Sequence, residues 1–320
     1  MNVLSLFDGM SCGRVALERA GIPVTSYHAC EIDKYARAVS FKNYPDIIHH
    51  GDVTQHWPNY KVDLLIGGSP CQGFSFAGKG LAFDDPRSKL FFEFVRIWNE
   101  VKAKNPDAKF LLENVRMKKE HLAVITEVMG VEPVCINSAL VSAQNRVRYY
   151  WTNIGEVSQP ADLGILLKDI IEDRVDFDAF KISEAGLARA KITKYSKPRI
   201  NPEKTGTMNL YNNSQKLCFD AGTTFVTKDF SVRCVQQILK NSKTVDDKSI
   251  ALCVNSNITG SGVTTITDGE IYRRLSPIEC ERLQTLPDNY TEGVSNSQRY
   301  KMLGNGWTVD VIAHIFKGLK

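Results

Sequence analysis

Short apolar runs alternate with longer amphipathic segments through the first half of the chain. Runs such as NVLSLF and VDLLI are typical of buried strands, whereas GRVALERAG and DKYARAVSFKNY repeat their apolar residues at helical spacing. The clearest amphipathic segment is 88–102, SKLFFEFVRIWNEVK, which predicts a helix packed on a sheet. This order predicts an α/β fold, with a mostly parallel sheet that has helices on both faces and ends near Ile154.

Beyond Ile154 the pattern changes. Residues 156–270 are rich in Asn, Thr, Lys and turn formers, and they carry only short strand signals. From residue 271 the chain returns to helical patterns, and Ser276 followed by Pro277 marks a helix start. We therefore expect a smaller module at 156–270, inserted into a domain built from 1–155 and 271–320.

The composition, 43% apolar and 24% charged in 320 residues, is that of an ordinary globular protein. No apolar run is long enough to span a membrane, and the first residues lack the features of a signal peptide. The eight cysteines include no C-x-x-C pair, which argues against a zinc site or a disulfide framework. We expect a cytoplasmic protein that holds no metal.

Positive charge is concentrated in one segment. Residues 181–248 contain ten Lys and three Arg against six acidic residues, a net charge of +7, although the whole chain has only +4. A basic segment on an otherwise neutral-to-acidic chain suits a polyanionic partner, of which nucleic acid is the usual one. A solvated Lys-rich surface explains the charge equally well.

Polar or glycine-rich motifs follow four of the expected strands, where ligands bind in open parallel sheets. These motifs are FDGMSCG at 7–13, CEID at 30–33, GDV at 51–53 and GGSPC at 67–71. The first has two glycines, not the three of the dinucleotide fingerprint, which favours a cofactor without a pyrophosphate. Glu31 lies where such folds bind a ribose, and Asp52 suits an adenine amino group. Each acid alone could equally form a turn or helix cap; their succession favours a nucleoside-containing cofactor.

Cys71 follows a proline directly after the strand-like VDLLI. Gly67, Gly68 and Pro70 end that strand, so Cys71 is expected on a loop at its tip. A cysteine that only packs would sit more naturally inside the apolar run. The position favours chemistry by the thiol.

Eight motifs occur in an order that resembles the DNA cytosine-5 methyltransferases. They are FDGMSCG, CEID, GD at 51–52, GGSPCQGFS, LLENV at 111–115, QNRVRYYW at 144–151, RRLSPIECERLQTLP and LGNGW at 303–307. The resemblance covers nearly all of the chain except 156–270. It implies the Rossmann-like fold of the S-adenosylmethionine-dependent methyltransferases, with 156–270 as a target-recognition domain that binds double-stranded DNA.

The same resemblance assigns four catalytic residues. Cys71 would be the nucleophile that adds to C6 of cytosine, because C5 is a poor nucleophile until the ring is activated. Glu113 would hold N3 and the exocyclic amine, although a structural ion pair is the plain alternative. Arg148 would approach the base, while Arg146 buttresses the pocket; a surface basic pair is the alternative reading. The two arginines are expected on one face of one strand.

S-adenosylmethionine is the cofactor that the resemblance implies. The residues expected to bind it are Phe7, Asp8, Gly9, Met10, Ser11, Cys12, Glu31, Ile32, Asp52, Val53, Pro70, Leu90, Asn305, Gly306 and Trp307. The acid after Phe7 and the Trp after LGNG resemble the eukaryotic de novo enzymes. The compact length and QNRVRYYW resemble the bacterial or phage enzymes found in restriction-modification.

The expected reaction requires the target cytosine to leave the DNA stack, with the glycine-containing segment 71–89 as a closing loop. One rival is an RNA cytosine-5 methyltransferase, which the basic module and the absence of a Cys-Phe-Thr signature disfavour. Another is a catalytically silent DNA-binding accessory subunit, which the presence of Cys71 and Glu113 disfavours. A nicotinamide-dependent oxidoreductase is a more distant rival.

Overall fold

The computed structural model describes residues 1–69, 89–172, 175, 178–180, 224–226, 232–234, 251–252, 265–267 and 272–320. The chain divides into two compact units. The first comprises Met1–Asn137, Val147–Pro160 and Trp307–Lys320; the second comprises Ser138–Arg146 and Ala161–Gly306. The functional domain limits 1–155, 156–270 and 271–320 stay a prediction.

Both units combine helices and strands. In chain order the first contains β1 (Asn2–Leu6), α1 (Cys12–Ala20), β2 (Ser26–Cys30), α2 (Lys34–Asn43), β3 (Ile48–His49), η1 (Val53–Gln55), β4 (Leu64–Gly67), α3 (Lys89–Lys104), β5 (Lys109–Val115), α4 (Lys119–Met129), β6 (Val134–Asn137), β8 (Val147–Thr152), α12 (Val309–Phe316) and η6 (Lys317–Leu319). The second contains η3 (Ser138–Leu140), β7 (Gln144–Asn145), α5 (Leu167–Ile170), η4 (Asp178–Phe180), β9 (Thr224–Val226), β10 (Val232–Cys234), β11 (Ala251–Leu252), β12 (Thr265–Thr267), β13 (Tyr272–Arg274), α10 (Pro277–Leu283) and α11 (Asn296–Asn305).

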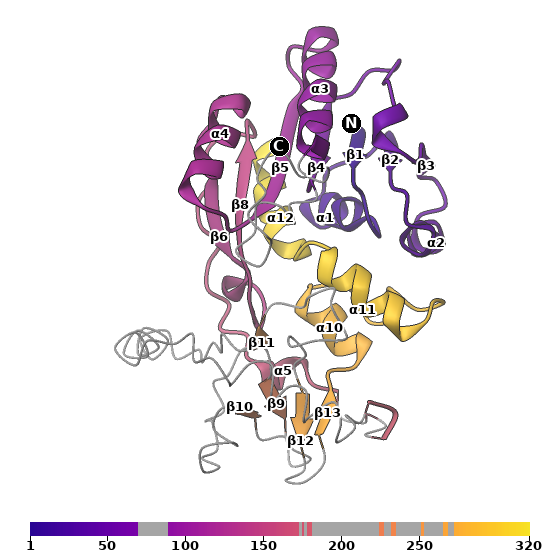
Figure 1. The fold of residues 1–320 in the computed structure, drawn as a ribbon, viewed down its shortest axis with the longest axis vertical. Helices are drawn as coiled ribbons and strands as arrows, with labels where there is room; N and C mark the ends of the chain where they lie inside the picture. Colours follow the sequence, from indigo (N-terminus) through magenta and orange to yellow (C-terminus); the bar gives the residue numbers. More distant parts are fainter. Residues whose placement is uncertain are drawn as a thin grey trace. The chain divides into compact units, whose positions relative to one another are not determined.

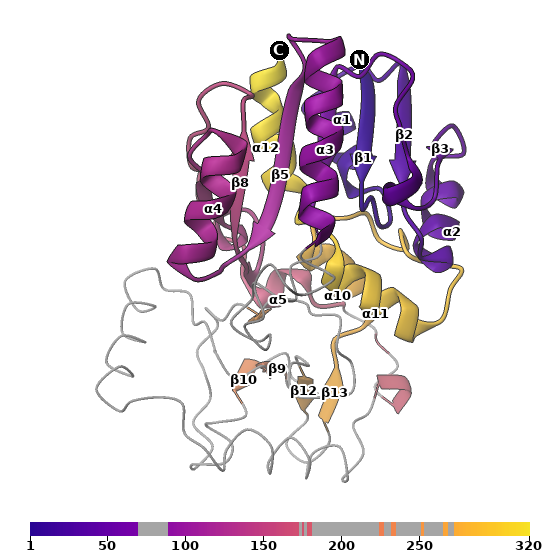
Figure 2. The same cartoon turned by 45° about the horizontal axis from the view of Figure 1, so that its top comes forward.

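The first unit is built on a seven-stranded sheet in the order β3-β2-β1-β4-β5-β8-β6. Every neighbouring pair is parallel except the two pairs that involve β8, which runs antiparallel to β5 and to β6. Figure 1 shows the sheet, and in Figure 2 α3 and α4 lie in front of it while α1 and α12 lie behind. The expected mostly parallel α/β fold with helices on both faces is confirmed.

Helix α3 supplies much of the core on its face of the sheet, as its periodicity predicts. Its buried side chains recur at helical spacing and pack against residues of β1, β4 and β5. Burial of each such side chain contributes roughly 1.5–3 kcal/mol to stability relative to leaving it exposed.

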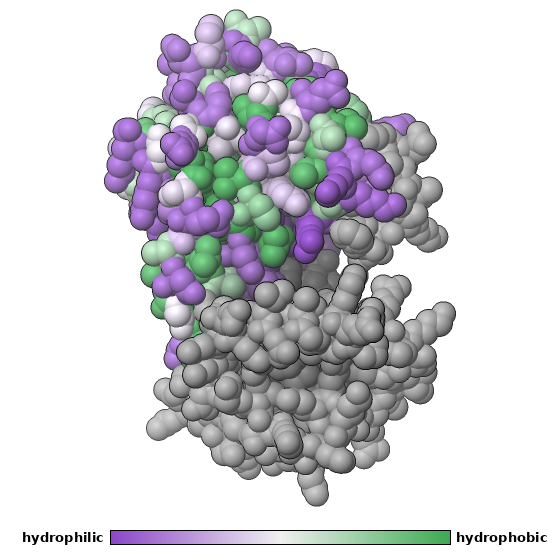
Figure 3. Space-filling view, turned by 90° about the vertical axis from the view of Figure 1, so that its left-hand side faces the viewer, coloured by the Kyte–Doolittle hydropathy of each residue, from purple (hydrophilic) through white to green (hydrophobic). Residues whose placement is uncertain are grey.

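Seen from the side of α4, the described surface of the first unit mixes hydrophilic and hydrophobic residues, which is usual for a solvated face (Figure 3).

Side-chain caps fix where two helices begin. Asp33 caps α2 by accepting hydrogen bonds from the backbone N–H groups of Tyr35 and Ala36. In the second unit, Ser276 and Glu279 form a capping box at α10, which confirms the helix start expected at Ser276. The cap at Asp33 places α2 directly after the CEID motif.

The loop between β1 and α1 follows an unusual path. Phe7, Gly9 and Ser11 all have positive φ, at 57°, 60° and 65°, a conformation that non-glycine residues rarely adopt. A buried network supports it: Asp8 accepts hydrogen bonds from Ser11 Oγ at 2.5 Å and from Tyr27 Oη at 2.7 Å. Burial raises the pKa of Asp8 from 3.8 to about 6, against the opposing effect of these hydroxyl donors.

A methyl group at Gly13 should disrupt the packing of α1 on the sheet. A Cβ there would lie 2.4 Å from Ile66 Cδ1 and 2.9 Å from Tyr27 Oη, so buried neighbours must move. We expect Gly13→Ala to lower the free energy of unfolding by about 1–3 kcal/mol, measured by urea denaturation. Glu127→Ala, at an exposed position of α4, is the control and should change it by less than about 0.5 kcal/mol. Equal effects of the two would contradict the packing argument.

Asp8→Asn should change how stability depends on pH. Because the Asp8 pKa is raised to about 6, the folded protein binds a proton between about pH 6 and 4 that the unfolded chain does not bind. The wild-type protein therefore gains stability as pH falls through that window, whereas the variant, whose amide does not titrate, gains none from this position. The Tm of Asp8→Asn minus the wild-type Tm should become more negative from about pH 7 to about pH 4.5. A constant difference would mean that Asp8 titrates as if in water.

Candidate active site

The register of the parallel strands brings the ends of β1, β2 and β4 and the last part of β5 to one edge of the sheet. Leu6 at the end of β1 pairs with Cys30 of β2 and with Gly67 of β4, and Gly67 pairs with Leu112 of β5. The next residues along these strands therefore lie at one level; they are Phe7, Glu31, Gly68 and Glu113. This is the edge at which ligands bind in open α/β sheets.

Glu31 connects the segments that follow β1 and β2. Its Oε2 accepts a hydrogen bond from the backbone N–H of Gly9 at 2.8 Å, and its Oε1 accepts one from the backbone N–H of Asp33 at 2.7 Å. Each carboxylate oxygen has two lone pairs, so both oxygens retain capacity for a hydroxyl donor. The structure thus brings Gly9 and Glu31 together, as a shared ligand site requires.

Asp52 and Val53, which are expected to contact adenine, are held in place by hydrogen bonds within the first unit. Asp52 caps η1, because its Oδ1 accepts hydrogen bonds from N and Oγ1 of Thr54, each at 2.9 Å. Arg96 of α3 donates to the carbonyl oxygen of Val53 at 3.2 Å. Val53 is buried, whereas Ile32 is 75% exposed, a large apolar side chain at the sheet edge with surface free for a planar ring.

The remaining first-unit candidates differ in burial. The side chains of Met10 and Cys12 are buried in the core, so only their backbone atoms could face a ligand. Phe7 and Leu90 are partly buried and pack against the core cluster under α3. Ser11 is fully buried and supports Asp8 and Ser40 through its hydroxyl.

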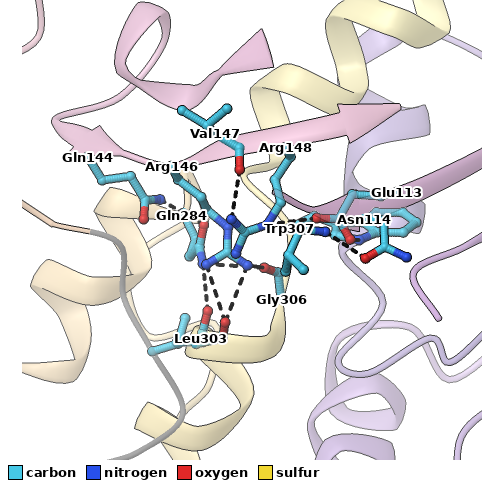
Figure 4. A network of polar contacts seen from close by, with 12 residues as sticks. Glu113, Asn114, Gln144, Arg146, Val147, Arg148, Gln284, Leu303, Gly306 and Trp307 are labelled. Atoms are coloured by element: carbon cyan, nitrogen blue, oxygen red, sulfur yellow. Dashed lines mark hydrogen bonds and ion pairs between the residues drawn. The ribbon is translucent and has the colours of Figure 1, made fainter. Parts of the chain in front are cut away.

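Glu113, the carboxylate of the candidate catalytic set, is buried, with 8% of its surface exposed. Arg148 of β8 forms an ion pair with it, Nε lying 3.0 Å from Oε1. The indole Nε1–H of Trp307 donates to Oε2 at 3.2 Å (Figure 4). A buried carboxylate needs such partners, because an unpaired buried charge is strongly destabilising. Three predicted site residues, far apart in sequence, therefore meet in one cluster.

Arg146 makes different contacts from Arg148. In the second unit its guanidinium donates to the carbonyl oxygens of Gly304 at 3.3 Å and Gly306 at 2.9 Å, and only 4% of the residue is exposed (Figure 4). The single strand expected to carry both arginines is interrupted at Arg146. The cause is a change of pairing partner, since β7 pairs with β11 and β8 pairs with β5 and β6. The Arg146 side chain thus stabilises the backbone around Gly304 and Gly306 by binding its carbonyl groups.

The other candidates divide between the second unit and the part of the chain that is not described. Asn305 and Gly306 end α11 in the second unit and directly precede Trp307. Pro70, Cys71, the expected closing loop and most of 156–270 lie outside the described residues. In the described ranges no three metal-ligating side chains come together. No described helix is long and apolar enough to cross a membrane.

Several residues that support the candidate site were missed from the sequence. Tyr27 holds Asp8, Arg96 holds the segment after Asp52, and Gln284 donates to the carbonyl oxygen of Leu303 at 2.6 Å. The sequence does place Tyr27 on an expected strand, yet its partner depends on tertiary packing. Gln284 lies within the motif RRLSPIECERLQTLP, but its partner Leu303 depends on tertiary packing and is not indicated by the local pattern.

Known proteins resemble the whole chain. A type II methyltransferase of Lactococcus lactis subsp. cremoris, M1.ScrFI, is 29% identical over 97% of this chain and 75% of its own length. The type II methyltransferase M.HhaI of Haemophilus parahaemolyticus is 27% identical over 98% of this chain and 93% of its own. The crystal structure of the S. pombe Dnmt2 methyltransferase superposes with a TM-score of 0.66 at 16% identity, covering 100% of this chain and 99% of that chain, which is a likeness of fold.

The model of one family, the C-5 cytosine-specific DNA methylases, matches residues 1–320. The enzymes of this family take their methyl group from S-adenosylmethionine. The mostly parallel sheet and the cluster of Glu113, Arg148 and Trp307 at its carboxyl edge agree with this match. Because the family model covers the full length, this chain belongs to the family of C-5 cytosine-specific DNA methylases.

Proposed function

We propose that this chain methylates C5 of cytosine in double-stranded DNA at a specific short sequence, through a covalent bond between Cys71 and C6 of a flipped-out base. The observation that carries the proposal is the enclosed Glu113, which Arg148 and Trp307 hold at the carboxyl edge of the sheet. Strand β4, whose end leads to Cys71, is the direct neighbour of β5, which carries Glu113. A thiol that follows one strand and a carboxyl group on the neighbouring strand are what the reaction needs.

The chemistry assigns each group a task. The Cys71 thiolate adds to C6, which moves electron density onto the ring and makes C5 nucleophilic. Glu113 holds N3 and the exocyclic amine as this density builds up. C5 then takes the methyl group, loses its proton to a base, and the C5–C6 double bond forms again as the Cys71 thiolate leaves.

The residues at the sheet edge fit S-adenosylmethionine, which would supply an electrophilic methyl group. A Cβ built at Gly9 meets no atom within 4 Å, so there is open space beside the loop after β1. Glu31 can accept a hydrogen bond from a ribose hydroxyl, Asp52 can hold the adenine edge, and Ile32 can cover the adenine face. The backbone of Met10, Ser11 and Cys12 would line the same site, with Pro70, Leu90, Asn305, Gly306 and Trp307 completing it.

DNA recognition falls to residues 156–270 in this proposal. The net charge of +7 between residues 181 and 248 suits a phosphate backbone, and base contacts made by this module would give sequence specificity. The target base must be extruded at a cost of a few kcal/mol, because C6 and C5 are hidden in the stack. The assay below, which compares transfer RNA with duplex DNA, tests the alternative that the substrate is RNA.

Cys71→Ser should abolish methyl transfer while S-adenosylmethionine binding stays within about threefold, because the substitution removes a thiolate and changes one atom. Transfer is measured as tritium incorporated from labelled cofactor into plasmid DNA, and bisulfite sequencing identifies the modified cytosines. Treatment with the wild-type protein should protect cytosines in one sequence context from conversion by bisulfite. It should also form a persistent covalent complex with 5-fluorocytosine DNA, since fluorine cannot leave C5 as a proton does.

Two outcomes would contradict the proposal. Full turnover by Cys71→Ser would exclude covalent catalysis through this residue. Transfer RNA and duplex DNA are assayed with the same protein preparation. Methylation of the RNA alone would show that the substrate is RNA and not DNA.

A further inference from the structure

We propose that Trp307 is a positioning residue for Glu113: its indole N–H fixes the orientation of the carboxylate, in addition to any contact with the cofactor. This inference rests on the proposed role of Glu113. It starts from one contact, the hydrogen bond from Trp307 Nε1 to Glu113 Oε2 at 3.2 Å, which joins residues 194 positions apart (Figure 4).

The carboxylate of Glu113 has one partner on each oxygen, an ion pair with Arg148 on Oε1 and a hydrogen bond from Trp307 on Oε2. Arg148 Nε lies 3.0 Å from Oε1, and Trp307 Nε1 lies 3.2 Å from Oε2. The terminal torsion of a glutamate side chain is broad and has no deep well of its own. Partners on both oxygens therefore set the plane of the carboxylate, and that plane decides which lone pairs are left for N3 and the amine of cytosine.

The surroundings leave the indole ring little freedom to move. A Cβ at Gly68 would lie 3.0 Å from Trp307 Nε1 and 2.9 Å from Glu113 Oε2. A Cβ at Gly13, at the start of α1, would lie 3.4 Å from Trp307 Cζ3. The ring thus lies against two glycines, one following the β1–α1 loop and one at the end of β4. Neither position has room for a side chain beside it.

The backbone that follows Trp307 is also held. The next residue, Thr308, is buried and is the N-cap residue of α12, which belongs to the same unit as Trp307 and Glu113. The backbone N–H of Val311 donates to the Thr308 carbonyl oxygen at 3.1 Å. A side chain next to such a fixed helix start is a suitable support for a carboxylate that must keep one orientation.

The test removes the indole N–H. In Trp307→Phe the carboxylate loses the donor on Oε2, so we expect kcat to fall by about tenfold to a hundredfold, since small misplacements of a reacting group have effects of that size. The Kd for S-adenosylmethionine should change by less than about threefold, because the ring surface is largely retained. Single-turnover transfer to duplex DNA and isothermal titration with the cofactor give the two quantities.

A double-mutant cycle with Glu113→Gln shows whether Trp307 acts through Glu113. If it does, adding Trp307→Phe to Glu113→Gln should cost less than about a further twofold, because the group being positioned is already lost. A Trp307 that serves only the cofactor pocket would give independent, multiplicative losses, and that result would overturn the inference. A shift in cofactor Kd with unchanged kcat would also overturn it.

Trp151→Phe is the matched control. Trp151 lies on β8, and its indole Nε1–H donates to Thr126 Oγ1 at 3.0 Å, so this variant loses the same kind of bond away from Glu113. We expect its kcat to stay within about twofold of wild type. An equal loss of kcat in Trp151→Phe would assign the effect of Trp307→Phe to general loss of an indole bond, and the inference would fail.

Two further results separate the possible causes of failure. If Trp307→Phe does not fold, 3-benzothienylalanine at position 307 replaces the N–H with sulfur and keeps the ring shape, and the same loss of kcat is expected. If Glu113→Gln alone keeps full activity, the proposed role of Glu113 is wrong and the inference falls with it. If Glu113→Gln loses activity and Trp307→Phe does not, only the inference is wrong.

Discussion

The desolvation of negative charge at one edge of a parallel sheet is the constraint on which the candidate site depends. The register of β1, β2, β4 and β5 brings Glu31 and Glu113 to one level at this edge, and a third acid, Asp8, lies two residues beyond the end of β1. Each needs donors, and each has different ones. Glu31 has two backbone N–H groups, Glu113 has a guanidinium and an indole, and Asp8 has the hydroxyls of Ser5, Ser11 and Tyr27.

The donors differ because each acid lies beside different backbone and side-chain groups, and the three carboxylates therefore have different surroundings. Hydroxyl donors offset burial only in part, and the negative charge of Glu31 adds to the effect, so the pKa of Asp8 is raised to about 6. Asp8 supports the loop after β1 through these hydroxyl donors, and its expected contact with the cofactor stays a prediction. Glu31 ties that loop to the start of α2, and the backbone donors it uses are already in place before any ligand arrives.

Local pattern was sufficient for the fold class and for the starts of several elements, whereas the roles of the site residues stay predictions. The spacing of Phe91, Phe94 and Trp98 predicts α3, and Ser276 predicts the capping box at α10, because both signals are short-range. The pairing of Tyr27 with Asp8 could not be predicted, since it depends on the register of β1 with β2. The same holds for the two arginines: strand periodicity places them on one face, but β7 and β8 pair with different strands, and the periodicity ends between them.

Gly68 shows how closely sequence and geometry are linked at this edge. From the sequence it is a residue that ends a strand before Pro70 and Cys71, and any turn former would serve that purpose. In the structure a side chain at this position would approach both Glu113 Oε2 and Trp307 Nε1 within 3.0 Å. Glycine is therefore required because the strand that leads to Cys71 passes directly beside the hydrogen bond that holds Glu113. The absence of a side chain at Gly68 thus leaves room for the contact between the Glu113 carboxylate and the Trp307 indole.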